Sequence, residues 1–116
     1  MSRNLALALA LALSTAASSV AVAAATGDPA QGKKAYTAQC LICHGKAGDG
    51  KGPAGAALTP KPADFTDADW WADRTDDSVM ATIKRGKTGT AMQPFAVSQE
   101  QLRHLVAYLR SLEPGG

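Results

Sequence analysis

The stretch that decides the fold runs from Thr37 to Pro53 and reads TAQCLICHGKAGDGKGP. It contains the only two cysteines of the 116-residue chain, Cys40 and Cys43, with two residues between them. One of the two histidines, His44, follows the second cysteine directly. Three kinds of site use such a group: a redox-active disulfide, part of a zinc site, and covalent attachment of haem.

The first 25 residues have the pattern of a secretory signal. Arg3 precedes an apolar run over residues 5–13, and small residues follow over 14–25. The apolar run is too short for a membrane-spanning helix. We therefore predict cleavage before Thr26, with cleavage after Ala23 as the alternative, and export to the periplasm without stable membrane insertion.

Removal of 25 of the 116 residues leaves 91, enough for one small domain over residues 26–116. Without Arg3 the chain holds 11 basic and 10 acidic residues, and this near-neutral balance gives no support for nucleic-acid binding. Six of the acidic residues fall between residues 64 and 77. A basic cluster follows: Lys84, Arg85 and Lys87. Such clusters are usually solvated surface, but they can also orient a charged partner.

The mature chain is predicted to be all-helical. Helices are expected over about 29–39, 75–85 and 98–112, because apolar residues recur there at helical spacing or capping residues precede them. The expected capping residues are Asp28, Thr75 or Asp76, and Ser98. No segment shows the alternation typical of a strand.

The segment 45–65 is predicted to be a functional loop. It holds five glycines and three prolines without a sustained period. A loop of this length is unusual in so small a domain unless it has a function. We expect it to wrap around a bound cofactor.

Two of the three possible sites are disfavoured. A thioredoxin-like disulfide follows a strand in a βαβ unit, and no such strand is predicted. A zinc site needs four ligands, and the only other histidine is His104. On the last helix His104 projects away from the apolar face, so we interpret it as a surface residue.

Haem attachment explains all three residues together. Two thiols three residues apart on a helical turn lie on one face and can react with the two vinyl groups of a porphyrin. The next residue, His44, can bind the iron. We therefore predict one covalently attached haem c, with its iron, held by Cys40, Cys43 and His44.

On these residues the chain resembles the class I monohaem c-type cytochromes, which are small electron carriers. The resemblance extends from Gly32 and Tyr36 through CLICH to MQPF and the last helix. It implies an all-α cytochrome c fold, with three to four short helices and long loops wrapped around one haem. It also implies a close crossing of the first and last helices, formed by Gly32, Tyr36 and Tyr108.

Met92 is predicted to be the second axial ligand. The other methionine of the mature chain, Met80, lies within a predicted helix, where methionine most often fills core space. Met92 lies in an irregular loop 48 residues after His44, and the family's distal methionine sits in such a loop before the last helix. Met/His coordination raises the reduction potential into the range that an electron carrier uses.

The resemblance also implies that a proline carbonyl accepts a hydrogen bond from the ring of His44. The candidates are Pro53, Pro60 and Pro62, and we favour the last two. Side chains that could donate to the haem propionates are Trp70, Trp71 and Arg74. Core packing for one tryptophan and solvent exposure for the arginine is the alternative.

The predicted function is periplasmic electron transfer between redox protein partners, by a monomer that is not an enzyme. The alternative is a haem-bearing subunit of a larger periplasmic oxidoreductase complex, in which the sequence DADWW would anchor an interface. An enzyme with an open iron position, such as a peroxidase, is disfavoured because Met92 would close that position.

Overall fold

The computed structural model describes residues 12, 14, 16–17 and 27–115. The predicted signal segment, residues 1–25, lies almost entirely outside these residues, as does Thr26, so the domain boundary stays a prediction. In the part of the chain that the structure describes, no helix has the length and apolarity needed to cross a bilayer.

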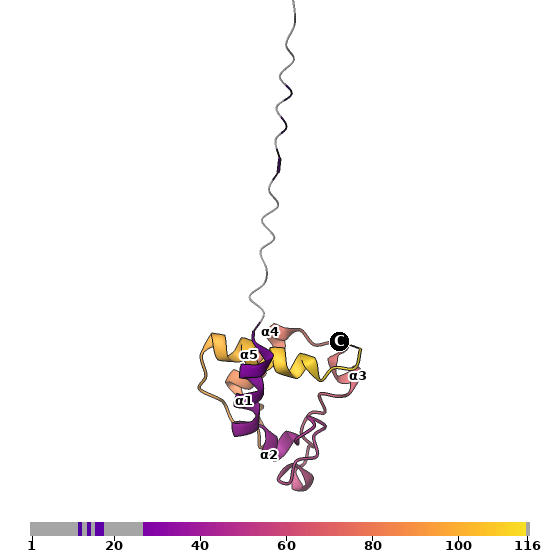
Figure 1. Cartoon of the computed structure of the whole chain (residues 1–116). Helices are drawn as coiled ribbons and strands as arrows, with labels where there is room; N and C mark the ends of the chain where they lie inside the picture. The colour runs from indigo at the N-terminus through magenta and orange to yellow at the C-terminus, as the bar shows by residue number, and fades with distance from the viewer. Residues whose placement is uncertain (1–11, 13, 15, 18–26, 116) are drawn as a thin grey trace, which may run out of the picture.

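The described residues form helices and loops, with no β-strand among them, so the predicted all-α class is confirmed. The elements are α1 (Pro29–Gln39), α2 (Leu41–His44), the 3-10 turn η1 (Gly55–Ala57), α3 (Ala68–Trp71), α4 (Asp76–Arg85) and α5 (Gln99–Ser111). Figure 1 shows α1 and α5 crossing, with α2 and the long loops extending to one side. The three helices predicted from the sequence are α1, α4 and α5. The one-turn helices α2 and α3 are not among the predicted ranges.

The three long helices begin where capping residues were expected. Asp28 caps α1, since its carboxylate accepts a hydrogen bond from a main-chain N–H at 2.9 Å. Thr75 and Ser78 form a capping box at the start of α4, and Ser98 and Gln101 form another at the start of α5. Each box satisfies main-chain N–H groups that the first turn of a helix leaves without partners.

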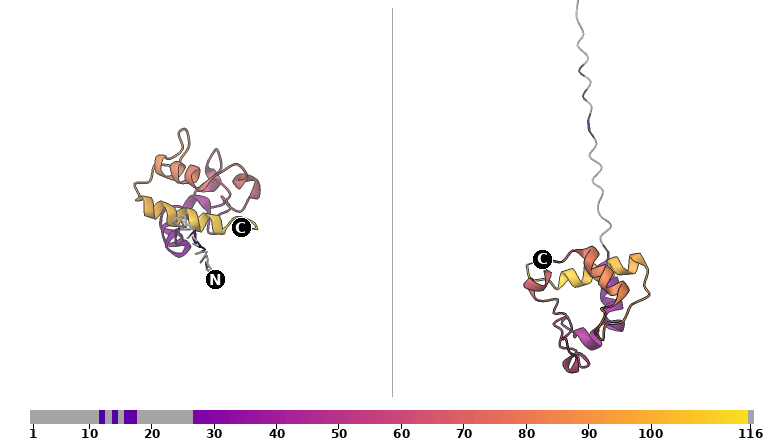
Figure 2. Two further views of the ribbon diagram at one scale, coloured as in Figure 1. Left: turned by 90° about the horizontal axis from the view of Figure 1, so that it is seen from above. Right: turned by 180° about the vertical axis from the view of Figure 1, so that it is seen from behind.

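Helices α1 and α5 cross in close contact, as the views from above and behind also show (Figure 2). A Cβ atom on Gly32 would lie 1.9 Å from the carbonyl oxygen of His104, so only glycine fits at this point. The rings of Tyr36 and Tyr108 pack beside it with centroids 5.1 Å apart. The predicted contact among Gly32, Tyr36 and Tyr108 is confirmed.

The surface position predicted for His104 is only partly correct. Its side chain is 23% exposed, and its Nδ1 accepts a hydrogen bond of 2.7 Å from the main-chain N–H of Asp28. Helical periodicity placed His104 opposite the apolar face of α5. The start of α1 covers that side of α5, and this contact between distant segments has no local sequence signal.

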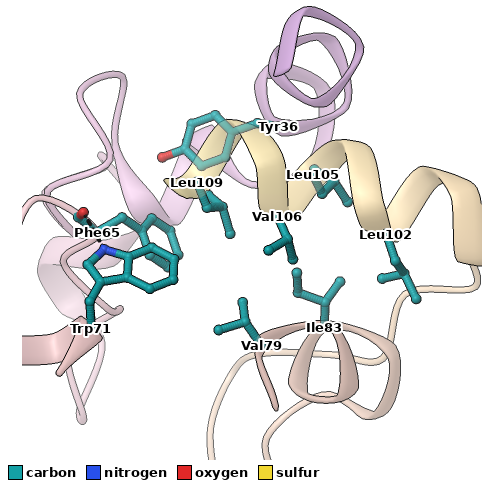
Figure 3. Close-up of a cluster of buried hydrophobic side chains, with 9 residues drawn as sticks. All are labelled: Tyr36, Phe65, Trp71, Val79, Ile83, Leu102, Leu105, Val106 and Leu109. Carbon is teal, nitrogen blue, oxygen red and sulfur yellow. Dashed lines mark hydrogen bonds between the residues drawn. The ribbon is translucent and has the colours of Figure 1, made fainter. Parts of the chain in front are cut away.

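Nine buried apolar residues form the core between α1, α4 and α5 (Figure 3). They are Tyr36, Phe65, Trp71, Val79, Ile83, Leu102, Leu105, Val106 and Leu109. The α5 residues of this set recur at three- and four-residue spacing, which places them on one face of the helix. Val79 and Ile83 come from the facing side of α4, so the two helices share one apolar layer.

Candidate functional site

The glycine-rich half of the 45–65 loop caps the end of α2, the helix that carries Cys43 and His44. Three loop amides donate to the last carbonyls of α2: Gly50 to His44 (2.8 Å), Gly52 to Cys43 (3.0 Å) and Ala54 to Ile42 (2.9 Å). A Cβ atom on Gly52 would lie 2.4 Å from the carbonyl oxygen of Ile42, so glycine is needed for this approach. The loop thereby satisfies carbonyl groups that a helix end otherwise leaves unpaired.

A cavity of about 690 Å³ opens beside α2. Its walls include Cys40, Cys43 and His44, several residues of α4, the loop over residues 86–95, and Leu105 and Leu109 of α5. Of the 45–65 loop, the lining residues are Leu58, Pro60, Lys61, Pro62, Ala63 and Phe65. The expectation that this whole loop wraps around a cofactor is therefore wrong for its first half, which packs on the main chain of α2.

The two cysteines are half-buried free thiols at the cavity wall. Burial, with a smaller contribution from Cys43, raises the pKa of Cys40 to about 11. A redox-active dithiol needs a lowered thiol pKa. The environment of Cys40 is thus unlike that of a thioredoxin-type centre.

The ring of His44 is held by two contacts. Its Nδ1 lies 3.2 Å from the carbonyl oxygen of Ala63, and its ring stacks on Phe65 with centroids 4.8 Å apart. Burial lowers the pKa of His44, and the hydrogen bond to Ala63 opposes this effect only in part. Because a carbonyl only accepts, Nδ1 carries the proton of the neutral ring and Nε2 keeps a free lone pair.

The predicted proline carbonyl is replaced by that of Ala63. The Pro62 oxygen lies beside Gly50, since a Cβ atom on Gly50 would lie 2.6 Å from it, whereas the Ala63 oxygen is the one within hydrogen-bond distance of the His44 ring. No sequence signal identifies Ala63, because the group used is a main-chain oxygen that every residue carries.

Met92 and Met80 lie in different environments. Met92 lines the same cavity as Cys40, Cys43 and His44. Met80 instead lines a separate hollow, where its sulfur lies 3.9 Å from the side-chain nitrogen of Gln99. Of these two methionines, Met92 alone shares the cavity with His44.

The three side chains proposed to face the propionates do not share one role. The indole N–H of Trp71 donates to the carbonyl of Phe65 at 2.9 Å, and Trp71 is 3% exposed, so its assignment to a propionate is wrong. Trp70 and Arg74 both line the cavity. The guanidinium carbon of Arg74 lies 4.3 Å from the centroid of the Trp70 ring, at cation–π distance.

The cavity wall is positively charged. Its cationic residues are Lys61, Arg74, Arg85 and Lys87, and no Asp or Glu of the described chain lines it. Lys84 belongs to the hollow beside Met80 instead, so the basic cluster of the sequence divides between two sides of α4.

These residues fit a haem. The cavity volume falls in the range of about 300–1,000 Å³ typical of ligand pockets. Two thiols and an imidazole with a free Nε2 line it together with a thioether, while Leu105 and Leu109 contribute apolar surface. Its cations suit the negative charge of two propionates.

Comparison with known proteins gives the family. A family model described as "Cytochrome C oxidase, cbb3-type, subunit III" matches residues 27–109. No curated protein sequence matches the chain. A chain in the structure of the Kuenenia stuttgartiensis reducing HAO-like protein complex Kustc0457/Kustc0458 is similar, with 30% identity and a TM-score of 0.64. The match covers 72% of this chain and 41% of that chain, so this chain spans less than half the length of that protein.

A second solved structure, the KustC0563 c-type cytochrome, has 29% identity and a TM-score of 0.58. That match covers 71% of this chain and 96% of the other. The predicted resemblance to class I monohaem c-type cytochromes and the predicted cytochrome c fold are thereby confirmed. On the match over residues 27–109, the chain belongs to the cytochrome c family described as "Cytochrome C oxidase, cbb3-type, subunit III".

Proposed function

We propose that the chain transfers single electrons through one haem c, attached to Cys40 and Cys43, with His44 and Met92 as the axial ligands of the iron. The observation that carries this proposal is the shared cavity, which these four residues line and Met80 does not. A bound haem supplies an iron that alternates between the ferrous and ferric states.

The chain's own contacts support both axial ligands. The hydrogen bond from His44 to Ala63 fixes the tautomer and the orientation of the ring, and it raises the basicity of the imidazole. The loop holds Met92 from both sides: its N–H donates to the hydroxyl of Thr90 at 3.2 Å, and its carbonyl accepts from the N–H of Lys87 at 3.1 Å.

Trp70 and Arg74 are the side chains best placed to bind the propionates. Arg74 is held over the Trp70 ring, and its guanidinium also contacts the carboxylate of Asp73 at 3.2 Å. A guanidinium has five N–H donors, so these contacts leave others for an anionic group. The indole N–H of Trp70 adds a further donor at the cavity wall.

We further propose that residues 1–25 direct export to the periplasm and that residues 26–116 form the mature domain. The support lies in the signal-like pattern of the first 25 residues and in the site itself, since c-type haem is attached outside the cytoplasm. The protein then acts between a redox protein donor and a redox protein acceptor, as a monomer and not as an enzyme.

A haem-bearing subunit of a larger periplasmic oxidoreductase is the second candidate. The family description and the complex containing a similar chain both favour it. The proposed anchor DADWW does not suit an interface, because Trp71 is buried in the core and Trp70 packs edge-on against it. Size exclusion of the native protein from its source separates the two: a free carrier elutes at the mass of one small domain, and a subunit elutes with partners.

A spectroscopic redox titration tests the proposed function. The purified holoprotein should show one reversible, one-electron transition, and its ferrous form should not bind carbon monoxide because Met92 occupies the sixth position. Rapid carbon monoxide binding by the unaltered protein would indicate an open iron position and a catalytic role such as that of a peroxidase.

A further inference from the structure

Tyr36 contacts the haem-attachment segment at both of its ends. Its main-chain carbonyl accepts the N–H of Cys40 at 2.8 Å, where the segment begins. Its phenolic hydroxyl donates to the carbonyl of Gly45 at 2.5 Å, directly after His44. The two polar groups of one residue thus bracket the sequence from Cys40 to Gly45.

The position of the hydroxyl is itself tightly determined. Tyr36 is 1% exposed, and its ring packs against that of Tyr108 on α5 at 5.1 Å between centroids. A buried hydroxyl without a partner destabilises the folded state, and the Gly45 carbonyl supplies the partner here. Burial also raises the pKa of Tyr36 well above the ordinary tyrosine value, so the hydroxyl remains a donor at neutral pH and into the alkaline range.

The restrained carbonyl lies at the point where the chain leaves α2. Gly45 has φ of 88°, and its carbonyl also accepts the N–H of Gly48 at 3.1 Å. Gly45 directly follows His44 and begins the loop that carries Ala63 back to the His44 ring. A donor on Gly45 therefore acts on the orientation of the His44 ring without touching it.

On this arrangement we infer that Tyr36 is a positioning residue for His44: its hydroxyl holds the end of α2 so that Nδ1 of His44 keeps its hydrogen bond to Ala63. The inference rests on the proposed function, since it treats His44 as the iron ligand. That hydrogen bond raises the basicity of the imidazole, and a more basic ligand favours ferric iron. Loss of the Tyr36 hydroxyl should therefore raise the reduction potential.

The chain offers a matched control. Tyr36→Phe removes the hydroxyl and keeps the ring packing, and Gly45 keeps the donor from Gly48. Tyr108→Phe removes a hydroxyl from the other ring of the same pair. If packing alone mattered, the two variants would behave alike.

The test compares the two variants with the unaltered holoprotein by redox titration and by proton NMR of the ferric state. Tyr36→Phe should raise the potential and move the paramagnetically shifted signals of the His44 ring, while Tyr108→Phe should change neither. The inference would be overturned if both variants changed the potential and the His44 signals by the same amount, or if Tyr36→Phe changed neither.

Two NMR measurements on the unaltered protein complete the test. The Tyr36 hydroxyl proton should give a slowly exchanging NMR signal close to Gly45, and its absence would overturn the inference even if the variant does not fold. Shifted signals from the His44 ring establish this residue as the ligand independently of Tyr36. If the shifted His44 signals are absent, the proposed function fails and the inference about Tyr36 fails with it. If they are present but do not move in the Tyr36→Phe variant, only the inference about Tyr36 is overturned.

Discussion

The Nδ1 atom of His44 lies 3.2 Å from the carbonyl oxygen of Ala63, in the loop that lines one wall of the cavity. Because a carbonyl oxygen cannot donate, this contact assigns the proton of the neutral ring to Nδ1. Nε2 is then the nitrogen available to a metal, and the ring is held in one orientation. Because the acceptor is a main-chain oxygen, replacing the Ala63 side chain would not remove it.

Met92 and Met80 provide a direct comparison of ligand and packing roles. Met92→Ala should lower the reduction potential and allow cyanide or carbon monoxide to bind, because it removes the sulfur ligand and opens the sixth position. It should also abolish the weak long-wavelength sulfur-to-iron absorption, while the haem stays attached.

Met80→Ala is the control. Met80 is only half-buried beside Gln99, so the variant should keep the spectrum and the potential. It should lose less than about 2 kcal/mol of unfolding free energy, the lower end of the range for a fully buried methionine. A spectral change in Met80→Ala with none in Met92→Ala would reverse the ligand assignment.

Charges at the cavity wall should steer an acidic redox partner. Lys87→Glu, at the cavity wall, should slow electron transfer at low ionic strength, and the difference from the unaltered protein should shrink as salt is added. Lys84→Glu should have a smaller effect because Lys84 lies on the side of α4 near Met80. Stopped-flow rates that fall equally in both variants would indicate an effect of net charge alone.

The crossing of α1 and α5 should not tolerate a side chain at position 32. Gly32→Ala would place its Cβ atom 1.9 Å from the carbonyl oxygen of His104, so the helices must separate. The expected loss is about 1–3 kcal/mol of unfolding free energy or more, measured by denaturant unfolding of the holoprotein. Lys33→Ala, at the next and exposed position of α1, should stay within about 0.5 kcal/mol of the parent.

The buried Tyr36 should make stability fall at alkaline pH. Burial first, and then the nearby Tyr108 and Asp49, raises the pKa of Tyr36 above its ordinary value. Above pH of about 10, the unfolded chain releases a proton that the folded protein retains, so the unfolding free energy decreases as pH rises. Tyr36→Phe should lose less stability over the same pH range, and parallel curves for the two proteins would contradict this account.

Much of the fold and part of the site could be predicted from local sequence. Capping residues and helical periodicity predicted α1, α4 and α5, because these signals act within a few residues of each other. The motif from Cys40 to His44 similarly placed two thiols and an imidazole on one turn. The crossing at Gly32 came from the family resemblance, and the backbone contact with His104 explains it.

The remaining features depend on contacts between distant segments. The acceptor for His44 is the main-chain oxygen of Ala63, whose direction depends on how the loop packs against Gly50. The same holds for Trp71, whose indole bonds to Phe65, and for His104, which α1 covers. In these cases composition and spacing indicated which residue types matter but not which partner each one meets.

The pyridine haemochrome spectrum of the purified protein, measured beside that of the Cys40→Ala/Cys43→Ala variant, decides whether haem is attached to the two cysteines. The unaltered protein should hold one haem that acid and organic solvent do not extract, with the spectrum of a porphyrin whose two vinyl groups are both converted to thioethers. The double variant should carry no covalent haem and be largely unfolded by circular dichroism, since so small a domain depends on the haem for buried apolar area. Extractable haem in the unaltered protein would rule out attachment to Cys40 and Cys43, and a cooperatively folded double variant of normal helicity would show that the fold does not depend on the haem.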